Sequence, residues 1–256
     1  MTRYVVVASG KGGVGKTTLA ANIGVALAKL GKNVAVLDAD VVMANLEIIM
    51  GIHNPPVALI DTLSGRLSIE DVLYEGPDGV KVIPAGITLD GFNERNMEML
   101  KTALKEIPHE IEILVIDAPA GRDAAMVMDE GQEVLIVTTP TVSSVSDALK
   151  MKILAERMGA KVIGAIVNRV EGKPRELSIQ EIENTLDANV VSIIEESEEV
   201  KDALAYEVPF VTRYPTASVS REVMRLSSSL IGRELRIEEE GFLDKVKGRF
   251  NSILKR

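Results

Sequence analysis

A glycine-rich loop near the N-terminus limits this chain to a small number of folds. It fits the pattern G-x-x-x-x-G-K-[ST], directly after an apolar run at 4–8, and its residues are Gly10, Lys11, Gly12, Gly13, Val14, Gly15, Lys16, Thr17 and Thr18. Glycines allow consecutive backbone N–H groups to approach phosphate oxygens, while Lys16 reaches the terminal phosphates and the Thr17 hydroxyl binds Mg²⁺. The loop therefore predicts a site for a nucleoside triphosphate with Mg²⁺.

The residues on either side supply the strand, loop and helix that such a site requires. A β-branched run, Val5 to Val7, precedes the loop. After it, apolar residues recur at helical spacing before Gly31, which predicts a helix that ends there; they are Leu19, Ala20, Ile23, Ala26, Leu27 and Leu30. A glycine-rich turn that binds nothing would require neither Lys16 nor Thr17.

Beyond this unit, β-type runs alternate with helical patterns. The predicted strands are residues 4–8, 33–37, 80–84, 113–116, 133–138, 162–167 and 190–194. Several are continuous Val, Ile and Leu runs, as in sheets covered on both faces. The predicted fold class is α/β, with a doubly wound, mainly parallel sheet flanked by helices and with ligands beyond the carboxyl ends of the strands. Two proline-containing stretches, 51–64 and 207–218, predict loops.

Carboxylates follow two of the predicted strands, where we expect them to lie beside the glycine-rich loop. Asp38 and Asp40 come directly after the strand at 33–37, and Asp117 ends the strand at 113–116. Phosphoryl transfer needs a metal to neutralise developing charge and a residue to orient the attacking water, and carboxylates at strand ends can serve both roles. The alternative for Asp38 and Asp40 is a role as helix cap or turn residue.

The glycine-rich loop, with its second lysine at position 11, resembles the deviant phosphate loop of the MinD and ParA ATPases, with MinD as the nearest member. In that family the early lysine reaches the nucleotide of the partner subunit, so the resemblance implies that Lys11 joins ATP binding to dimerisation. Residues 37–46 resemble the first switch of the family. This implies that Asp40 positions the water and helps to hold hydrated Mg²⁺, that Asp38 supports the strand end, and that Asn45 lies near the dimer interface. The alternative for Lys11 is a solvated loop lysine.

Residues 117–121 resemble the second switch of the same family, D-x-P-x-G. The resemblance implies that Asp117 serves the Mg²⁺-bound nucleotide. It also implies that the loop containing Pro119 reports the γ-phosphate, to which Gly121 donates a backbone N–H.

The resemblance also places the nucleobase. Asn168 matches the family position whose asparagine meets adenine, and the loop at Pro209 packs along the base. Guanine-specific GTPases carry N-K-x-D, whereas this chain has Asn-Arg-Val-Glu from position 168, so adenine is favoured. The alternative for Asn168 is a turn residue that satisfies its own backbone. The implied cofactors are ATP and Mg²⁺, and the implied catalytic residues are Lys11, Lys16 and Asp40.

The C-terminal residues 241–256 carry a separate signal. At about 100° per residue, their apolar side chains fall within one arc of about 120°; they are Phe242, Leu243, Val246, Phe250, Ile253 and Leu254. The segment has five basic residues against Asp244 alone, a formal charge of +4, whereas the rest of the chain sums to −13. This pattern is typical of a membrane-surface helix and resembles the membrane-targeting tail of MinD. The alternative is a helix that docks its apolar stripe on its own domain.

Composition narrows the function classes. The chain has no cysteine, which excludes disulfides and the iron–sulfur members of the superfamily as functional analogues. It has neither a secretion signal nor an apolar stretch of about 18 residues, so we expect a cytoplasmic protein that binds the inner face of the membrane peripherally in its ATP state. A net charge of −9 opposes nonspecific binding to DNA.

We therefore expect a deviant phosphate-loop ATPase domain over residues 1–237 and an amphipathic membrane-targeting tail over residues 238–256. The expected activity is slow ATP hydrolysis, stimulated by an activating or effector protein. We expect the protein to form a homodimer with ATP and to regulate spatial organisation in the cell, for example the placement of the cell-division site. Two alternatives remain. A ParA-like DNA segregation ATPase would need basic residues clustered on one face, and a small-molecule ligase or kinase would need a substrate pocket, for which no motif is present.

Overall fold

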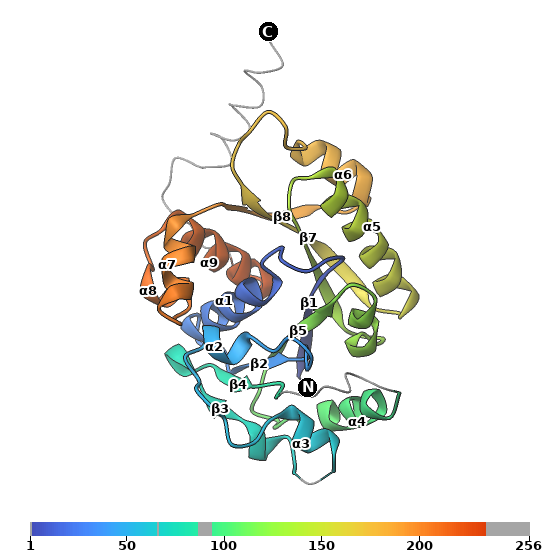
Figure 1. Ribbon diagram of the computed structural model, residues 1–256, viewed down its shortest axis with the longest axis vertical. Coiled ribbons are helices and arrows are strands. Elements are labelled where there is room, and N and C mark those ends of the chain that lie inside the picture. Colours follow the sequence, from blue (N-terminus) through green and yellow to red (C-terminus); the bar gives the residue numbers. More distant parts are fainter. Residues whose placement is uncertain (1, 66, 87–93, 234–256) are drawn as a thin grey trace.

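The computed structural model describes residues 2–65, 67–86 and 94–233. Within them lies one sheet of eight strands in the order β3-β4-β2-β5-β1-β6-β7-β8, at the centre of Figure 1. The strands are β1 Arg3–Ser9, β2 Val34–Asp38, β3 Tyr74–Glu75, β4 Lys81–Ile83, β5 Ile113–Ala120, β6 Glu133–Thr138, β7 Lys161–Val170 and β8 Val190–Glu195. Each neighbouring pair is parallel except β3 with β4. The predicted α/β class is confirmed.

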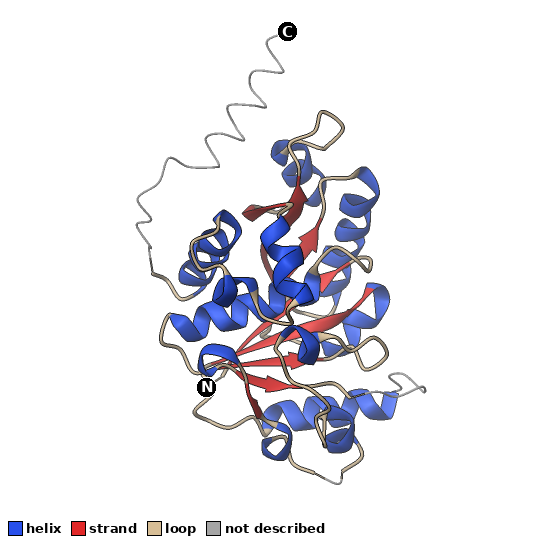
Figure 2. Ribbon diagram, turned by 60° about the vertical axis from the view of Figure 1, so that its left-hand side comes forward, coloured by secondary structure: helices blue, strands red, loops and turns tan. Residues whose placement is uncertain are grey.

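Helices cover both faces of the sheet, as Figure 2 shows. One face packs against α1 Lys16–Lys29, α2 Leu46–Ile49, α7 Glu198–Ala205, α8 Phe210–Arg213 and α9 Ser218–Leu230. The other packs against α3 Leu59–Leu63, α4 Glu94–Lys105, α5 Val142–Arg157, α6 Ile179–Leu186 and the 3₁₀ helix η3 Gly121–Val127. Two further 3₁₀ turns, η1 Glu70–Val72 and η2 Pro77–Gly79, flank β3. The helix predicted to end at Gly31 is α1.

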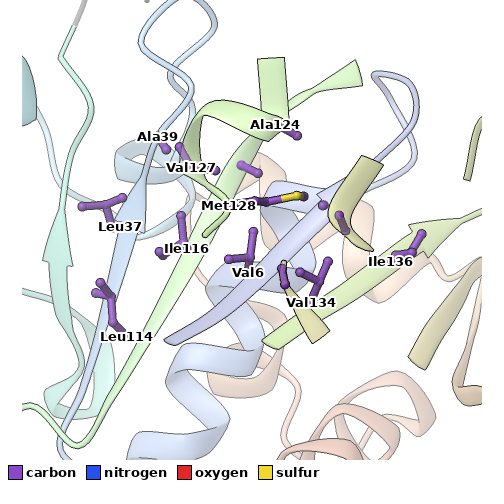
Figure 3. Packing of buried hydrophobic residues seen from close by; sticks show 14 of the residues in the cluster. Val6, Leu37, Ala39, Leu114, Ile116, Ala124, Val127, Met128, Val134 and Ile136 are labelled. Atoms are coloured by element: carbon purple, nitrogen blue, oxygen red, sulfur yellow. The ribbon is translucent and has the colours of Figure 1, made fainter. Parts of the chain in front are cut away.

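The strands are apolar throughout because both of their faces are buried. In β1, Val5 and Val7 belong to the cluster under α1, whereas Val6 and Ala8 belong to the cluster on the opposite face. Figure 3 shows part of the cluster on the opposite face, which joins side chains of β1, β2, β5 and β6 with Met128. Burying one such side chain stabilises the fold by roughly 1.5–3 kcal/mol, so this alternation makes a continuous apolar run favourable.

The seven predicted strands are all present, and two differences bear on the site. The strand predicted at 113–116 is longer, because β5 continues through Asp117 to Ala120, which pairs with Ser9 of β1. The start of residues 117–121, which resemble the second switch, is therefore part of the sheet. The sequence did not predict β3, since two residues at a sheet edge are too short to show a period.

The loop predictions for 51–64 and 207–218 were wrong in part, because each stretch contains a short helix. In α3, Asp61 accepts the N–H of Ala58 at 3.0 Å, and Leu59 is fully buried. In α8, the helix starts directly after Pro209, and Phe210 is buried. Proline excludes the interior of a helix but suits the residues that begin one, so prolines in these stretches did not exclude a helix that follows them.

The position of β1 determines where a ligand can bind. It lies in the middle of the sheet between β5 and β6, so that β2 to β5 occupy one side of it and β6 to β8 the other. Where the strand order reverses in this way, a crevice opens beyond the carboxyl ends of the strands. The glycine-rich loop follows β1 and therefore lies at this crevice.

Candidate nucleotide-binding site

The glycine-rich loop joins the end of β1 to the start of α1. Gly13 and Gly15 have φ angles of +79° and +92°, which L side chains rarely adopt, so both positions require glycine. A Cβ on Gly10 would lie 2.1 Å from the carbonyl oxygen of Asp147 in α5, so Gly10 must lack a side chain as well. Lys16 begins α1. The free N–H groups of the first helical turn therefore adjoin the loop, which is the arrangement that binds phosphate.

Lys16 and Asp117 form a buried ion pair in this site. Lys16 Nζ lies 2.6 Å from Asp117 Oδ1, and the two side chains are 8% and 1% exposed. Burial raises the pKa of Asp117, and the Lys16 ammonium and the Thr17 hydroxyl oppose the increase. The structure thus brings together the loop lysine and the carboxylate that the sequence assigned to the metal.

Asp38 lies beside Asp117, because the two residues are paired in register on β2 and β5. Asp38 Oδ1 accepts the N–H of Asp40 at 2.9 Å, and Oδ2 accepts the N–H groups of Asn45 and Leu46 at 3.2 and 3.1 Å. Burial, and next the charge of Asp117, raise the pKa of Asp38 to about 8. These hydrogen bonds to Asp38 hold the loop between β2 and α2 in place, which fits the predicted role of Asp38 in supporting the strand end.

Asp40 and Asn45 lie in this loop at the end of β2. Asp40 Oδ1 accepts the N–H of Met43 at 3.0 Å, so the turn role that the sequence left open is present. Asp40 donates its N–H to Asp38, the register partner of Asp117, and the Asp40 charge helps to raise the pKa of Asp117. Asn45 is exposed and donates to the Met43 carbonyl oxygen at 2.7 Å. Val42 and Met43 are 60% and 69% exposed, so the tip of the loop is apolar and open to solvent.

A magnesium ion fits these groups. Thr17, Asp40 and Asp117 offer hydroxyl and carboxylate oxygens, and Asp117 Oδ2 is buried without a hydrogen-bond partner among the described residues. Among the residues that the structure describes, no cluster of three or more His, Asp or Glu side chains could hold a metal by itself. Mg²⁺ does not need such a cluster, because proteins hold it through one or two carboxylates together with substrate phosphates and water.

The end of β5 lies against the glycine-rich loop. Pro119 is inside the strand, and Gly121, with φ of +68°, starts η3. A Cβ on Gly121 would lie 3.7 Å from the carbonyl oxygen of Gly10, so the two backbones are neighbours. Both glycines line a cavity of ≈470 Å³ beside α5, together with Arg122, Asp147, Lys150, Met151, Ile153, Leu154 and Arg157. A movement of residues 117–121, the predicted second switch, would therefore displace the backbone of the glycine-rich loop at Gly10.

Lys11 lies apart from the Lys16–Asp117 pair. Its Nζ is 3.3 Å from Ser143 Oγ in the first turn of α5, an exposed contact. Its charge also contributes to lowering the pKa of Asp147, chiefly lowered by the hydrogen bond from Lys150. The position is compatible with a lysine that serves a second subunit and with a solvated loop lysine, so the cross-subunit role stays a prediction.

A second cavity, of ≈170 Å³, lies beside the first turn of α1, and we interpret it as the base site. Its lining residues are Gly15, Thr18, Leu19, Asn168, Arg169, Ile194, Glu195, Glu196, Ser197, Val200, Lys201, Leu204 and Phe210. Asn168 Nδ2 donates to the carbonyl oxygen of Val14 at 2.7 Å, so the side chain satisfies the backbone of the loop rather than its own. Pro209 caps α8 directly before Phe210. The two residues predicted for the base thus lie in or next to one cavity.

Asn22 supports the wall of this cavity from behind, although the sequence patterns did not single it out. It is fully buried in α1. Its Nδ2 donates to the Thr18 carbonyl oxygen at 2.7 Å, and its Oδ1 accepts the N–H of Val211 at 3.0 Å. Asn22 therefore holds α8, with Phe210, against the first turn of α1. An asparagine among apolar helix positions was the available signal for such a bridge.

The predicted membrane residues lie outside the described residues; they are Phe242, Leu243, Val246, Phe250, Ile253 and Leu254. Within residues 2–65, 67–86 and 94–233, no helix is both long enough and apolar enough to cross a membrane. Membrane binding therefore stays a prediction from the sequence.

Known proteins share this architecture. Residues 5–210 match the family model of the CobQ/CobB/MinD/ParA nucleotide binding domain. An uncharacterized ATP-binding protein of Methanocaldococcus jannaschii is 44% identical over 257 residues, which cover 98% of this chain and 97% of that protein. The septum site-determining protein MinD of Thermotoga maritima is 31% identical over 272 residues, or 99% of each chain. The solved structure of the septum site-determining protein MinD of Pyrococcus horikoshii, complexed with Mg-ADP, matches with a TM-score of 0.81 and 27% identity, over 93% of this chain and 100% of that chain.

Proposed function

The chain belongs to the CobQ/CobB/MinD/ParA family of nucleotide-binding domains, and we propose that it is a MinD-like ATPase. In this proposal it is an ATP-dependent dimerising switch that binds a membrane surface reversibly and organises positions inside the cell, with cell-division site placement as the role suggested by its relatives. The observation that carries the proposal is the convergence of Lys16, Asp40 and Asp117 at the glycine-rich loop.

The proposed reaction is hydrolysis of ATP to ADP and phosphate. Lys16 would hold the terminal phosphates. Thr17, Asp40 and Asp117 would hold hydrated Mg²⁺, which would neutralise the phosphate charge when bound. Asp40 orients the attacking water. Because Asp40 Oδ1 already accepts the N–H of Met43, we assign the water to Oδ2, which has no hydrogen-bond partner among the described residues.

The proposed dimer depends on Lys11. Its contact with Ser143 Oγ is 3.3 Å long and exposed, so little free energy is lost when the ammonium group leaves it for the phosphates of a second subunit. ATP in one subunit would then attract Lys11 of the other, which makes nucleotide binding and dimerisation one event.

The proposed membrane contact is the tail, residues 238–256. Each basic residue near an anionic leaflet contributes about 1 kcal/mol, and each partly buried apolar side chain adds about 1 kcal/mol after ordering costs. A single tail therefore binds weakly. Two tails on one dimer gain roughly 10²- to 10⁴-fold in apparent affinity. Dimerisation with ATP would place the protein on the inner face of the membrane, and hydrolysis would release it to the cytoplasm.

The third proposed partner is an activating or effector protein that contacts the exposed tip of the first switch. Val42 and Met43 are the apolar side chains there. Since the N–H of Met43 is bonded to Asp40, a protein that fixes the tip would also fix the water-orienting carboxylate. We do not propose DNA as a partner, because the chain outside residues 241–256 carries a net charge of −13.

Flotation of anionic vesicles with ATP and with ADP tests the proposal. We expect the wild-type protein to float with ATP and Mg²⁺ and to remain unbound with ADP. Lys16→Ala, which lacks the side chain for the terminal phosphates, should remain unbound with either nucleotide. Equal flotation with ATP and ADP would contradict a nucleotide switch, and retention on DNA without flotation would favour a segregation ATPase.

A further inference from the structure

One side chain of the base cavity also holds the glycine-rich loop. Asn168 Nδ2 lies 2.7 Å from the carbonyl oxygen of Val14. A carbonyl oxygen can only accept a hydrogen bond, so the nitrogen of the Asn168 carboxamide must face it, and the orientation of the amide is fixed. Asn168 is 8% exposed, so this bond forms largely away from water.

The contact is so close that the residue at position 15 cannot carry a side chain. A Cβ on Gly15 would lie 2.3 Å from Asn168 Nδ2, and the φ of Gly15 is +92°. Asn168 Nδ2 therefore lies against both residues of the Val14–Gly15 peptide bond, directly before α1 starts at Lys16. Lys16 and Thr17 follow directly. Their position relative to a phosphate depends on the backbone that Asn168 holds.

The other polar atom of the amide is left for a ligand. Oδ1 of Asn168 has no hydrogen-bond partner in the part of the chain that the structure describes, and Asn168 lines the base cavity. An oxygen accepts from the exocyclic amine of adenine, whereas guanine presents an acceptor at the same position. Rotating the amide to suit guanine would break the bond to Val14. The loop contact and the choice of base are therefore linked through one side chain.

We propose that Asn168 is a positioning residue for the glycine-rich loop, so that triphosphate binding depends on a residue of the base cavity even when no base is present. This inference rests on the proposed function, because it assumes that the loop binds ATP. It extends the base contact implied by family resemblance, which gives Asn168 no role toward the phosphates.

Asn22 provides a matched control. Like Asn168, it is a buried asparagine whose amide nitrogen donates to a backbone carbonyl oxygen, and its amide oxygen also accepts the N–H of Val211. Its partners are the Thr18 carbonyl oxygen in the first turn of α1 and the Val211 N–H in α8, and neither contact involves Val14 or Gly15. Loss of Asn22 should therefore loosen the wall of the base cavity and lower stability, without moving the carbonyl group of Val14.

The experiment compares ATP with inorganic tripolyphosphate, a probe that has phosphates and no base. Affinities of both for the wild type, Asn168→Ala and Asn22→Ala are measured with Mg²⁺, well below each Tm. We expect Asn168→Ala to bind tripolyphosphate about threefold to tenfold more weakly, the effect of one hydrogen bond, and ATP at least as much more weakly. Asn22→Ala should have a lower Tm and wild-type affinity for tripolyphosphate. Asn168→Ser, too short to reach Val14, repeats the test if the alanine variant does not fold.

Four results would overturn the inference. Asn168→Ala that loses affinity for ATP alone would show a base contact only, and unchanged affinities with a lower Tm would show a structural role only. Equal losses of tripolyphosphate binding in the Asn168 and Asn22 variants would show a general effect of buried asparagines. A wild type that binds ATP but not tripolyphosphate would also overturn it, since a loop held in place should bind phosphates alone. A wild type that does not bind ATP would instead contradict the proposed function.

Discussion

The ammonium group of Lys16 lies 2.6 Å from Oδ1 of Asp117, and both side chains are more than nine-tenths buried. The positive charge of Lys16 and the negative charge of Asp117 thereby neutralise each other in an environment from which most water is excluded. Removing one partner leaves an uncompensated buried charge, which costs more than the pair itself contributes.

Lys16→Ala should therefore lower the free energy of unfolding by about 3–5 kcal/mol, in addition to abolishing nucleotide binding. Urea denaturation without nucleotide measures the loss. Lys29→Ala is the matched control, because its pair with Asp78 is partly exposed and should contribute about 1 kcal/mol or less. Equal losses in the two variants would contradict the assignment of a buried pair.

Stability should depend on pH through Asp38. Burial, and next the charge of Asp117, raise its pKa to about 8 from an ordinary value of 3.8, so the folded protein keeps a proton that the unfolded chain releases between these values. The free energy of unfolding should fall as pH rises through this window, by at most about 1.4 kcal/mol per pH unit for one proton. Asp38→Asn cannot titrate there. Its stability relative to the wild type should improve with rising pH in denaturation curves, and parallel pH profiles would show that Asp38 does not carry this effect.

Asp40→Ala should abolish slow ATP hydrolysis and keep ATP-dependent dimerisation, because water positioning rather than binding is lost. Asp40→Asn separates chemistry from loop structure, since its side-chain oxygen can still accept the N–H of Met43. We expect both variants to hydrolyse ATP at least about 100-fold more slowly, measured as phosphate release. An active asparagine variant beside an inactive alanine variant would assign Asp40 to the turn alone.

Lys11→Ala should bind ATP nearly as the wild type does and remain monomeric. Its proposed partner is the nucleotide of the other subunit, whereas within its own chain it reaches Ser143. Light scattering with a nonhydrolysable ATP analogue decides the question. Lys32→Ala, which removes an exposed pair with Glu112, should dimerise normally. A Lys11 variant that dimerises with intact activity would show a solvated loop lysine.

Deleting residues 241–256 should leave folding and lipid-independent ATP hydrolysis intact while eliminating ATP-dependent binding to anionic vesicles. If the apolar stripe instead docks on the domain, the deletion should lower Tm by several degrees, because a few buried side chains contribute on the order of 3 kcal/mol or more. Vesicle binding should also weaken with salt, because the charge of +4 is screened. Vesicle binding retained by Phe250→Glu would count against a membrane role for the stripe.

The local patterns of the sequence predicted the elements that build the site. Val5 to Val7, the glycine-rich loop and the apolar positions of α1 each show their structure within a few residues, and so do the strands that carry Asp38 and Asp117. The helices α3 and α8 were missed because each is only one turn long and lies near prolines. Asn22 was missed because its role depends on a hydrogen bond from Val211, which is 189 residues away in the chain.

The sequence by itself determined the fold class, the phosphate-binding loop and the chemical types of the residues around it, because periodicity, glycine spacing and strand ends are local properties. The tertiary structure alone decided which residues share the site. Asp38 meets Asp117 because β2 pairs with β5, Lys16 reaches Asp117 across 101 residues of chain, and Asn168 holds Val14 across 154. Such contacts depend on strand order, which is set when both faces of the whole sheet are buried at once and which no short segment specifies.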